Sequence, residues 1–300
     1  MHRDPRDDRP LPVHPRRRGV AVSAALETAS GNETESGAAV ERALAELREH
    51  GVGVVPRVLS RERALAVRGA LLDAAAENER RGVATFMPEL DPNAANVRVF
   101  NLLDLHATFR ELILHPVATA LVRGLLGEHW AISNFTANVA KPGSGSMSLH
   151  SDLSLVMPEP WLAPWSMNIV WCLDDVDAEN GGTLYLPGSH RLARRSEVPR
   201  SPLPQMRAFS APLGSIVAMD GRVWHTSGAN VSADRERALL FGYYSADFLR
   251  PQVNHNVTLS PATQAALSPE LFERLKLGPD SNTRIGGTII GERPRPPGAA

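Results

Sequence analysis

The feature that most constrains the fold of this chain is a change in sequence character near Trp130. Before it, apolar residues recur at helical spacing, as in the segment 35–80. After it, short β-prone runs such as AISNFTANVA, WSMNIVWCLDD and RALLFGYYSAD alternate with turns rich in Gly, Pro, Asn and Asp. Helices followed by many short strands predict an α+β protein whose β part is a sandwich or a jelly roll.

The chain is long enough for one substantial hydrophobic core, since 43% of its 300 residues are hydrophobic. We expect a single domain over residues 36–290, because the helices need the sheet to bury their apolar faces. Residues 1–35, rich in Arg, Pro and Asp, and the Pro-rich residues 291–300 are expected to be disordered tails.

Charge and cysteine content narrow the class of protein. The 32 basic and 33 acidic residues nearly cancel, which argues against a nucleic-acid or membrane-surface binder. No apolar run approaches the length of a membrane-spanning helix. The single cysteine, Cys172, excludes an internal disulfide and a Cys-rich metal site, so cytoplasmic residence fits best. Nothing in the sequence specifies an oligomeric state.

His150 and Asp152 lie two residues apart inside SMSLHSDLSLV, a run that alternates like a β-strand. Residues two apart on a strand share one face, so both side chains would point the same way, with Cα atoms roughly 6.6 Å apart. Two histidines and one carboxylate on one face of an ion form the ligand set of non-haem Fe(II) oxygenases. The alternative is a surface strand that carries polar residues outward, because an H-x-D pair is common by chance.

Of the ten histidines, His225 is the best candidate for the third ligand. It follows a strand, a tight MDGR turn and the start of a second strand, which a jelly roll could return opposite the first. The other histidines lie in the tail, in the helical half, or in turns and loops, as His190 and His255 do.

Three segments together resemble the phytanoyl-CoA dioxygenase family of Fe(II)/2-oxoglutarate oxygenases: LHSD, WCLDDVDAENGGTLYLPGSHR and GSIVAMDGRVWHTSGANVSADRERALLFGYY. The resemblance extends over about residues 45 to 255. It implies a double-stranded β-helix, a cupin-like jelly roll, with N-terminal helices packed on it. It also implies that His150, Asp152 and His225 bind Fe(II), with 2-oxoglutarate and O2 as cosubstrates.

The resemblance further implies an arginine, after the distal histidine, that binds the far carboxylate of 2-oxoglutarate. Arg235 and Arg237 are both candidates, because SADRER is one residue longer than the usual spacing. Strand alternation favours Arg237, and the planar guanidinium suits a carboxylate. Ser227 matches a position that helps to hold the same carboxylate. Trp171 matches another cosubstrate-side position, although an ordinary core tryptophan is the alternative.

The implied reaction is hydroxylation of an unactivated C–H bond of a small metabolite, natural-product or amino-acid-derived, with release of succinate and CO2. A carboxylate ligand favours hydroxylation over halogenation, while desaturation, epoxidation and ring formation stay open, as do the substrate and the site of oxidation. A metal-free jelly-roll binding protein is the alternative from another class.

The loop that follows Asp152, LSLVMPEPWLAPWSM, is expected to lie over the iron. Its apolar side chains could line a substrate pocket, and the alternative is that its tryptophans only anchor the loop. The candidate substrate contacts are Leu153, Met157, Trp161, Trp165 and, from a separate irregular segment, Phe86.

Overall fold

The computed structural model describes residues 32–278 and two short strands at 284–285 and 288–289. Residues 1–31 and 291–300, which make up most of the two expected tails, lie outside the described residues. Residues 32–35 were also expected in the N-terminal tail, but the first helix begins at Asn32. In the part of the chain that the structure describes, no helix has both the length and the hydrophobicity needed to cross a bilayer.

Helices dominate the chain up to residue 126. In order, the elements are α1 (Asn32–His50), β1 (Val52–Val55), α2 (Arg61–Arg80), β2 (Asn96–Val99), α3 (Leu102–Leu105), α4 (Ala107–Ile113) and α5 (Pro116–Leu126). Local sequence explains their ends: the Ser60 hydroxyl caps α2 by accepting from Arg63 N–H at 3.1 Å, and Pro116 occupies the first turn of α5.

Strands dominate from Trp130 onward, which confirms the predicted change of secondary structure. The strands are β3 (Trp130–Ala140), β4 (Ser166–Cys172), β5 (Leu184–Tyr185), β6 (Arg207–Ala208), β7 (Ile216–Asp220), β8 (His225–Thr226) and β9 (Arg237–Ala246). The C-terminal elements are α6 (His255–Thr258), α7 (Pro261–Ala265), α8 (Pro269–Arg274), β10 (Arg284–Ile285) and β11 (Thr288–Ile289).

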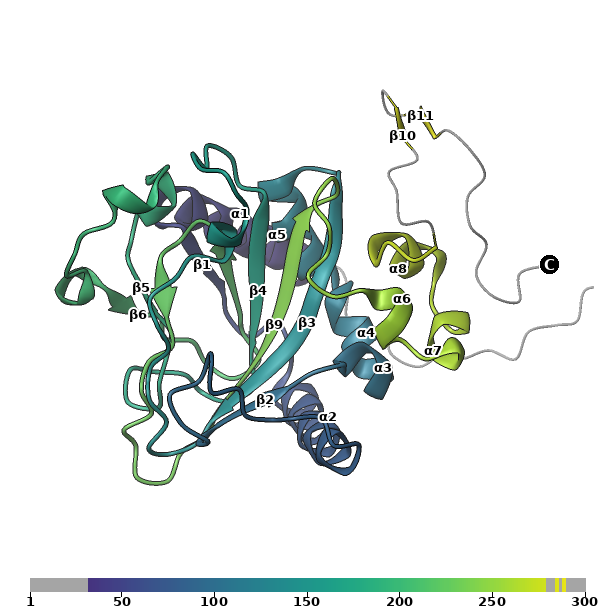
Figure 1. The fold of residues 1–300 in the computed structure, drawn as a ribbon, viewed down its shortest axis with the longest axis horizontal. Helices are drawn as coiled ribbons and strands as arrows, with labels where there is room; N and C mark the ends of the chain where they lie inside the picture. The colour runs from purple at the N-terminus through teal and green to yellow at the C-terminus, as the bar shows by residue number, and fades with distance from the viewer. Residues whose placement is uncertain (1–31, 279–283, 286–287, 290–300) are drawn as a thin grey trace, which may run out of the picture.

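Six strands form one antiparallel sheet in the order β1-β7-β4-β9-β3-β2. A smaller antiparallel sheet has the order β6-β5-β8. Figure 1 shows β4, β9 and β3 side by side at the centre, with β5 and β6 at the left and α6 to α8 at the right. The expected α+β architecture is therefore confirmed, with strands that are distant in sequence paired as in a jelly roll.

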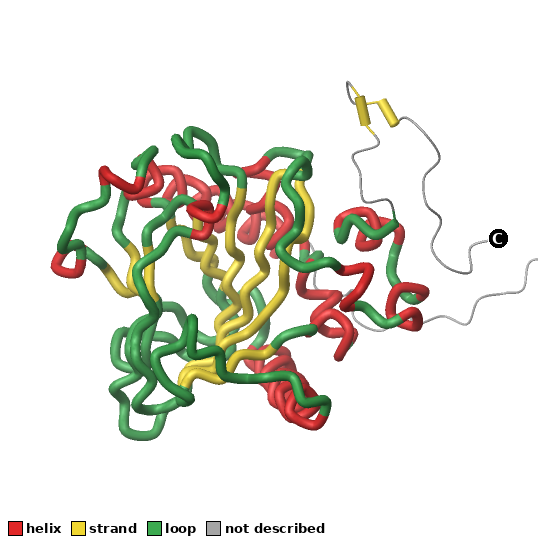
Figure 2. Tube along the Cα trace, viewed as in Figure 1, coloured by secondary structure: helices red, strands yellow, loops and turns green. Residues whose placement is uncertain are grey.

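Strand alternation gives the large sheet two faces with different neighbours. On the first face, side chains such as Ile169, Trp171 and Leu240 pack with the helices in one core that draws on residues 40 to 277. Figure 2 shows the strands of the large sheet in yellow, with helices in red beside them. On the second face, Val170 and Leu239 belong to a smaller core shared with the loops and the small sheet. We call these the helix face and the site face, because Asn168 and Arg237, two residues of the site described next, lie on the second one.

Candidate metal centre

The two candidate histidines meet because their segments pair across the small sheet. His150 N–H donates to His225 O at 3.0 Å, and His225 N–H donates to His150 O at 2.8 Å. The two rings lie with their centroids 4.3 Å apart. The strand that carries His225 therefore lies opposite the segment of His150, whereas β7, the strand before the MDGR turn, pairs with β1 and β4 in the large sheet.

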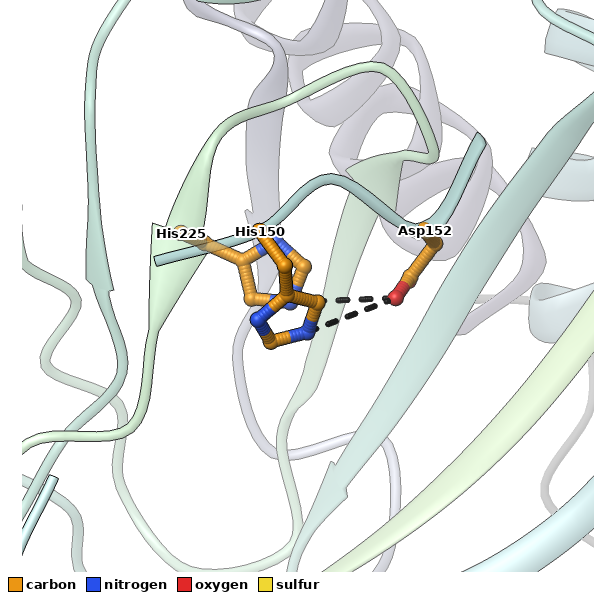
Figure 3. A group of neighbouring side chains, drawn as sticks. All are labelled: His150, Asp152 and His225. Atoms are coloured by element: carbon orange, nitrogen blue, oxygen red, sulfur yellow. Dashed lines mark ion pairs between the residues drawn. The ribbon is translucent and has the colours of Figure 1, made fainter. Parts of the chain in front are cut away.

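Asp152 reaches the same point by a different local structure from the one expected. A single bridge at His150 is followed by a 3₁₀ turn over Asp152–Leu155, rather than by a continuous strand. Asp152 Oδ1 nevertheless lies 3.7 Å from His150 Nε2 and 4.0 Å from His225 Nε2 (Figure 3). One donor atom from each of the three residues lies within 4.8 Å of the others.

This donor set fits a divalent transition metal. With metal–ligand bonds of about 2.1 Å at right angles, neighbouring donor atoms would be about 3 Å apart, so small side-chain shifts would suffice. His150 Nδ1 lies 2.9 Å from Ser148 O, and His225 Nδ1 lies 3.0 Å from Val223 O. A carbonyl oxygen only accepts, so each Nδ1 carries the proton and each Nε2 offers its lone pair to the metal.

Burial also prepares the distal histidine for metal binding. Burial lowers the pKa of His225, and the nearby Asp152 carboxylate opposes this effect only in part. A lowered pKa favours the neutral imidazole, which is the form that binds a metal.

Arg237 lies at the start of β9 with its side chain on the site face. It is 1% exposed, its Nη2 donates to Asn138 Oδ1 at 3.2 Å, and its Nε has no partner in the described chain. Burial, and to a smaller extent the charge of Arg98, lowers the pKa of Arg237 to about 10, so the guanidinium stays charged at neutral pH. A buried charge with an unmet donor is costly unless an anion such as a carboxylate meets it.

Arg235, the other candidate, is already paired. Its guanidinium donates to Asp177 at 2.7 and 3.1 Å and to Glu179 at 2.7 Å, at the surface. This geometry agrees with the alternation argument that favoured Arg237 over Arg235.

Ser227 is linked by hydrogen bonds to Met147 and through it to Arg98, whose charge acts on Arg237. The Ser227 hydroxyl accepts from Met147 N–H at 2.9 Å, so its own proton is free to be donated to a ligand. Arg98, which affects the pKa of Arg237, contacts Met147 Sδ at 3.1 Å and is itself paired with buried Asp91.

Trp171 does not reach the site. Its side chain is fully buried on the helix face, where its ring meets that of His115 edge-on with centroids 5.3 Å apart. The placement differs from the expected cosubstrate contact and matches the alternative, a core tryptophan.

The loop after the triad carboxylate has a buried part that anchors it. Leu153 and Trp161 are buried in a small cluster with Leu186 and Trp224. The Trp161 Nε1–H donates to Val156 O at 2.7 Å within the same loop. Both side chains therefore hold the loop in place, which is the alternative that the sequence left open for the tryptophan.

The remaining candidate substrate contacts are more exposed. Met157 is 71% exposed, and Trp165 is half-buried with its ring 5.7 Å from that of Phe248. Phe86 is half-buried in the irregular segment between α2 and β2. None of these contacts links Met157, Trp165 or Phe86 to the metal-binding atoms.

Sequence reasoning missed two polar residues beside the carboxylate. Asn168, in the middle of β4, donates from Nδ2 to Asp152 Oδ2 at 2.7 Å. Tyr243, which pairs with Asn168 across the sheet, donates to Asp152 O at 3.4 Å. Burial, and after it the charge of Asp152, raises the pKa of Tyr243, so its hydroxyl stays protonated. An asparagine inside the apolar run SMNIVWC was the available signal.

Comparison with known proteins agrees with this geometry. A family model described as phytanoyl-CoA dioxygenase (PhyH) matches residues 47–238. Dioxygenase af480 of Aspergillus fumigatus is 48% identical over 253 residues, which cover 84% of this chain and 80% of the relative. Dioxygenase andF of Emericella variicolor is 25% identical over 182 residues, which cover 56% of this chain and 63% of the relative.

Solved structures with the same fold include SnoK and HygX. SnoK, described as a non-heme alpha ketoglutarate dependent carbocyclase from nogalamycin biosynthesis, has a TM-score of 0.57 at 24% identity and covers 71% of this chain and 87% of its own. HygX of Streptomyces hygroscopicus, with nickel, 2-oxoglutarate and hygromycin B bound, has a TM-score of 0.57 at 17% identity and covers 70% and 88%. At these identities the likeness shows the shared fold.

Proposed function

Because the chain belongs to the phytanoyl-CoA dioxygenase family, we propose that it uses Fe(II) and 2-oxoglutarate to hydroxylate an unactivated C–H bond of a small metabolite. One observation carries the proposal: two imidazole Nε2 atoms and one carboxylate oxygen, brought from distant segments, converge on a common point. This is the facial ligand set of non-haem Fe(II) oxygenases, which leaves other coordination positions open for cosubstrate and O2.

Each group of the site has a proposed task. His150, Asp152 and His225 hold the metal, and Arg237 and Ser227 hold the far carboxylate of 2-oxoglutarate. When bound, Fe(II) and 2-oxoglutarate supply the oxidising chemistry, in which O2 gives one oxygen atom to succinate and one to the substrate, with release of CO2. The unmet Nε–H of Arg237 and the free hydroxyl proton of Ser227 support the carboxylate contacts.

The proposed substrate class is a small natural-product molecule. SnoK is named for nogalamycin biosynthesis and HygX was solved with hygromycin B, and these names support a small-molecule substrate for a protein of this fold. Mass spectrometry of products would separate the reactions, since hydroxylation or epoxidation adds one oxygen atom whereas desaturation or ring formation removes two hydrogen atoms.

The proposal takes residues 36–290 as one catalytic domain, which is supported by the shared core that draws on residues 40 to 277. We also propose the cytoplasm as its location, supported by the single, buried and unpaired Cys172.

The test is aerobic formation of succinate from 2-oxoglutarate, with and without added Fe(II). We expect metal-dependent turnover that His150→Ala abolishes, because two ligands do not complete the facial set. His129→Ala is the matched control, since His129 is 71% exposed and its loss should leave turnover unchanged. Unchanged turnover in His150→Ala would overturn the site, and metal-independent ligand binding without succinate would favour the metal-free binding protein.

A further inference from the structure

The carboxylate of the triad is oriented differently from the two imidazoles. Each imidazole bonds through Nδ1 to a main-chain carbonyl two residues away in its own segment. The carboxylate of Asp152 instead accepts from the side chain of Asn168, which lies on another element, β4. The orientation of the Asp152 carboxylate therefore depends on the side chain of Asn168, which a substitution can remove without changing the backbone.

The main chain around Asp152 is already fixed by other bonds. Leu153 N–H donates to Gly221 O at 2.8 Å, and the Ser151 hydroxyl donates to the same oxygen at 3.0 Å. The Tyr243 hydroxyl adds a longer bond, 3.4 Å, to Asp152 O. The remaining freedom is rotation of the Asp152 side chain, which would turn Oδ1 away from the imidazoles.

The bond from Asn168 limits this rotation. Its Nδ2 lies 2.7 Å from Asp152 Oδ2, so Oδ2 is occupied and Oδ1 faces both histidines. The orientation of the amide is set by chemistry, because only the NH2 group can donate to an ionised carboxylate. Asn168 itself is held in the middle of the sheet, where it pairs with Met219 of β7 and Tyr243 of β9.

Asn168 is costly for stability where it stands. Its Oδ1 is buried and has no partner among the described residues, and an unmet buried acceptor lowers the stability of the fold. On the same face of β4, Val170 and Cys172 are apolar, while Ser166 on the other side of Asn168 is polar and buried. The presence of an amide here is explained by what its Nδ2 does to the carboxylate.

We infer that Asn168 is a positioning residue, which holds the Asp152 carboxylate so that Oδ1 is presented to the metal. The inference rests on the proposed function, since it has content only if the triad binds a metal. It predicts that loss of the amide weakens metal binding through the geometry of Asp152, while the fold of the metal-free protein stays intact.

The experiment compares Asn168→Leu with Asn78→Leu in the full chain. Asn78 is the matched control, because its amide also donates one bond from Nδ2, to Phe100 O at 2.9 Å, and also has a buried Oδ1 without a partner among the described residues, but it lies on α2. The anaerobic Kd for Fe(II) is measured by calorimetry in the presence of 2-oxoglutarate, and the Tm is measured without metal.

For Asn168→Leu we expect Fe(II) binding about 10- to 100-fold weaker, the usual effect of losing an outer partner of a metal ligand, at a metal-free Tm that does not fall. For Asn78→Leu we expect an altered Tm and an unchanged Kd. An unchanged Kd in Asn168→Leu, or an equal weakening in both variants, would overturn the inference. If the leucine does not fit, Asn168→Ala removes the same bond without added bulk and carries the same expectation.

Failure of the proposed function would look different. If the unaltered protein does not bind Fe(II), or if Asp152→Ala binds it as tightly as the unaltered protein, the triad is not a metal site. If the unaltered protein binds Fe(II), Asp152→Ala does not, and Asn168→Leu binds normally, the metal site stands and only the role of Asn168 falls.

Discussion

The helix face and the site face of the six-stranded sheet are both buried, yet they hold different side chains. Trp171, Ile169 and Leu240 on the helix face are fully buried among apolar neighbours. An unmet polar atom occurs on the helix face too, because the indole Nε1 of Trp171 has no partner in the described chain. The site face differs in the kind of group it holds, since Arg237 and Asn168 bring a guanidinium and a carboxamide there, each with an unmet atom. The comparison teaches that one face serves stability, while the other keeps polar groups that only a ligand or a metal ligand makes useful.

The largest expected effect is on the helix face. Trp171→Ala should lower the free energy of unfolding by about 3–5 kcal/mol, because it removes a fully buried indole and leaves a cavity. Chemical denaturation measures this loss, and Trp171→Phe, which fills most of the space, should lose less. The Kd for 2-oxoglutarate should not change. A higher Kd at unaltered stability would instead support the cosubstrate-side role that the sequence predicted for Trp171.

Trp171 also shows how far the sequence could predict the structure. Membership of the dioxygenase family and the helix-to-strand change near Trp130 are confirmed, and His150, Asp152 and His225 do converge. Motifs spaced along the chain were sufficient for this, because each marks a strand end or a turn.

The faces of β4 could not be predicted in the same way. Both faces are buried, so SMNIVWC is almost continuously apolar and lacks the alternation that would separate Trp171 from Asn168. Which face meets the helices depends on the pairing with β7 and β9, and these strands are far away in sequence.

The sequence could not show which apolar side chains of the loop after Asp152 are buried, for a related reason. Trp161 is buried and Met157 is exposed, although both are apolar residues of one segment. The difference comes from distant segments that pack on the loop: Trp161 N–H donates to Ala193 O at 2.8 Å, and its ring joins the cluster of Trp224. Local sequence carries no information about such partners.

The next effect is a loss of stability at low pH, caused by protonation of a buried histidine that packs beside the helix-face core. Burial lowers the pKa of His255 from its ordinary value of 6.5 to about 4, and the histidine bonds to the backbone of Ile132 in the helix-face core. The unfolded chain then binds the proton more tightly than the folded one. The part of the free energy of unfolding that depends on neutral His255 is therefore fully present above pH 6.5 and is lost as the pH falls from 6.5 toward 4. The loss amounts to about 3 kcal/mol.

Urea unfolding of the metal-free protein at pH values from 6.5 down to 4 measures this loss in the free energy of unfolding. His255→Leu removes the titrating group, so its stability should fall less over the same range. Parallel losses in the two proteins would show that other groups cause the acid sensitivity.

The third effect is expected on binding and not on stability. Arg237→Leu should weaken 2-oxoglutarate binding by about 10- to 100-fold, because charge-assisted bonds to the carboxylate contribute about 1.5–3 kcal/mol. The Tm of the ligand-free protein should not fall, since the variant removes a buried charge with an unmet donor. Calorimetry with Fe(II) under anaerobic conditions gives the Kd. A normal Kd together with a lowered Tm would make Arg237 a structural residue.

The smallest effect is expected for Arg235→Ala, two residues away and outside the buried site. Its ion pairs with Asp177 and Glu179 lie at the surface, where water and salt screen them, so we expect a slight loss of Tm that disappears at high salt. The Kd for 2-oxoglutarate should equal that of the unaltered protein, which makes this variant the matched control for Arg237→Leu. If Arg235→Ala weakens 2-oxoglutarate binding and Arg237→Leu does not, the carboxylate is bound by the surface arginine, and the unmet donor of Arg237 no longer marks the cosubstrate site.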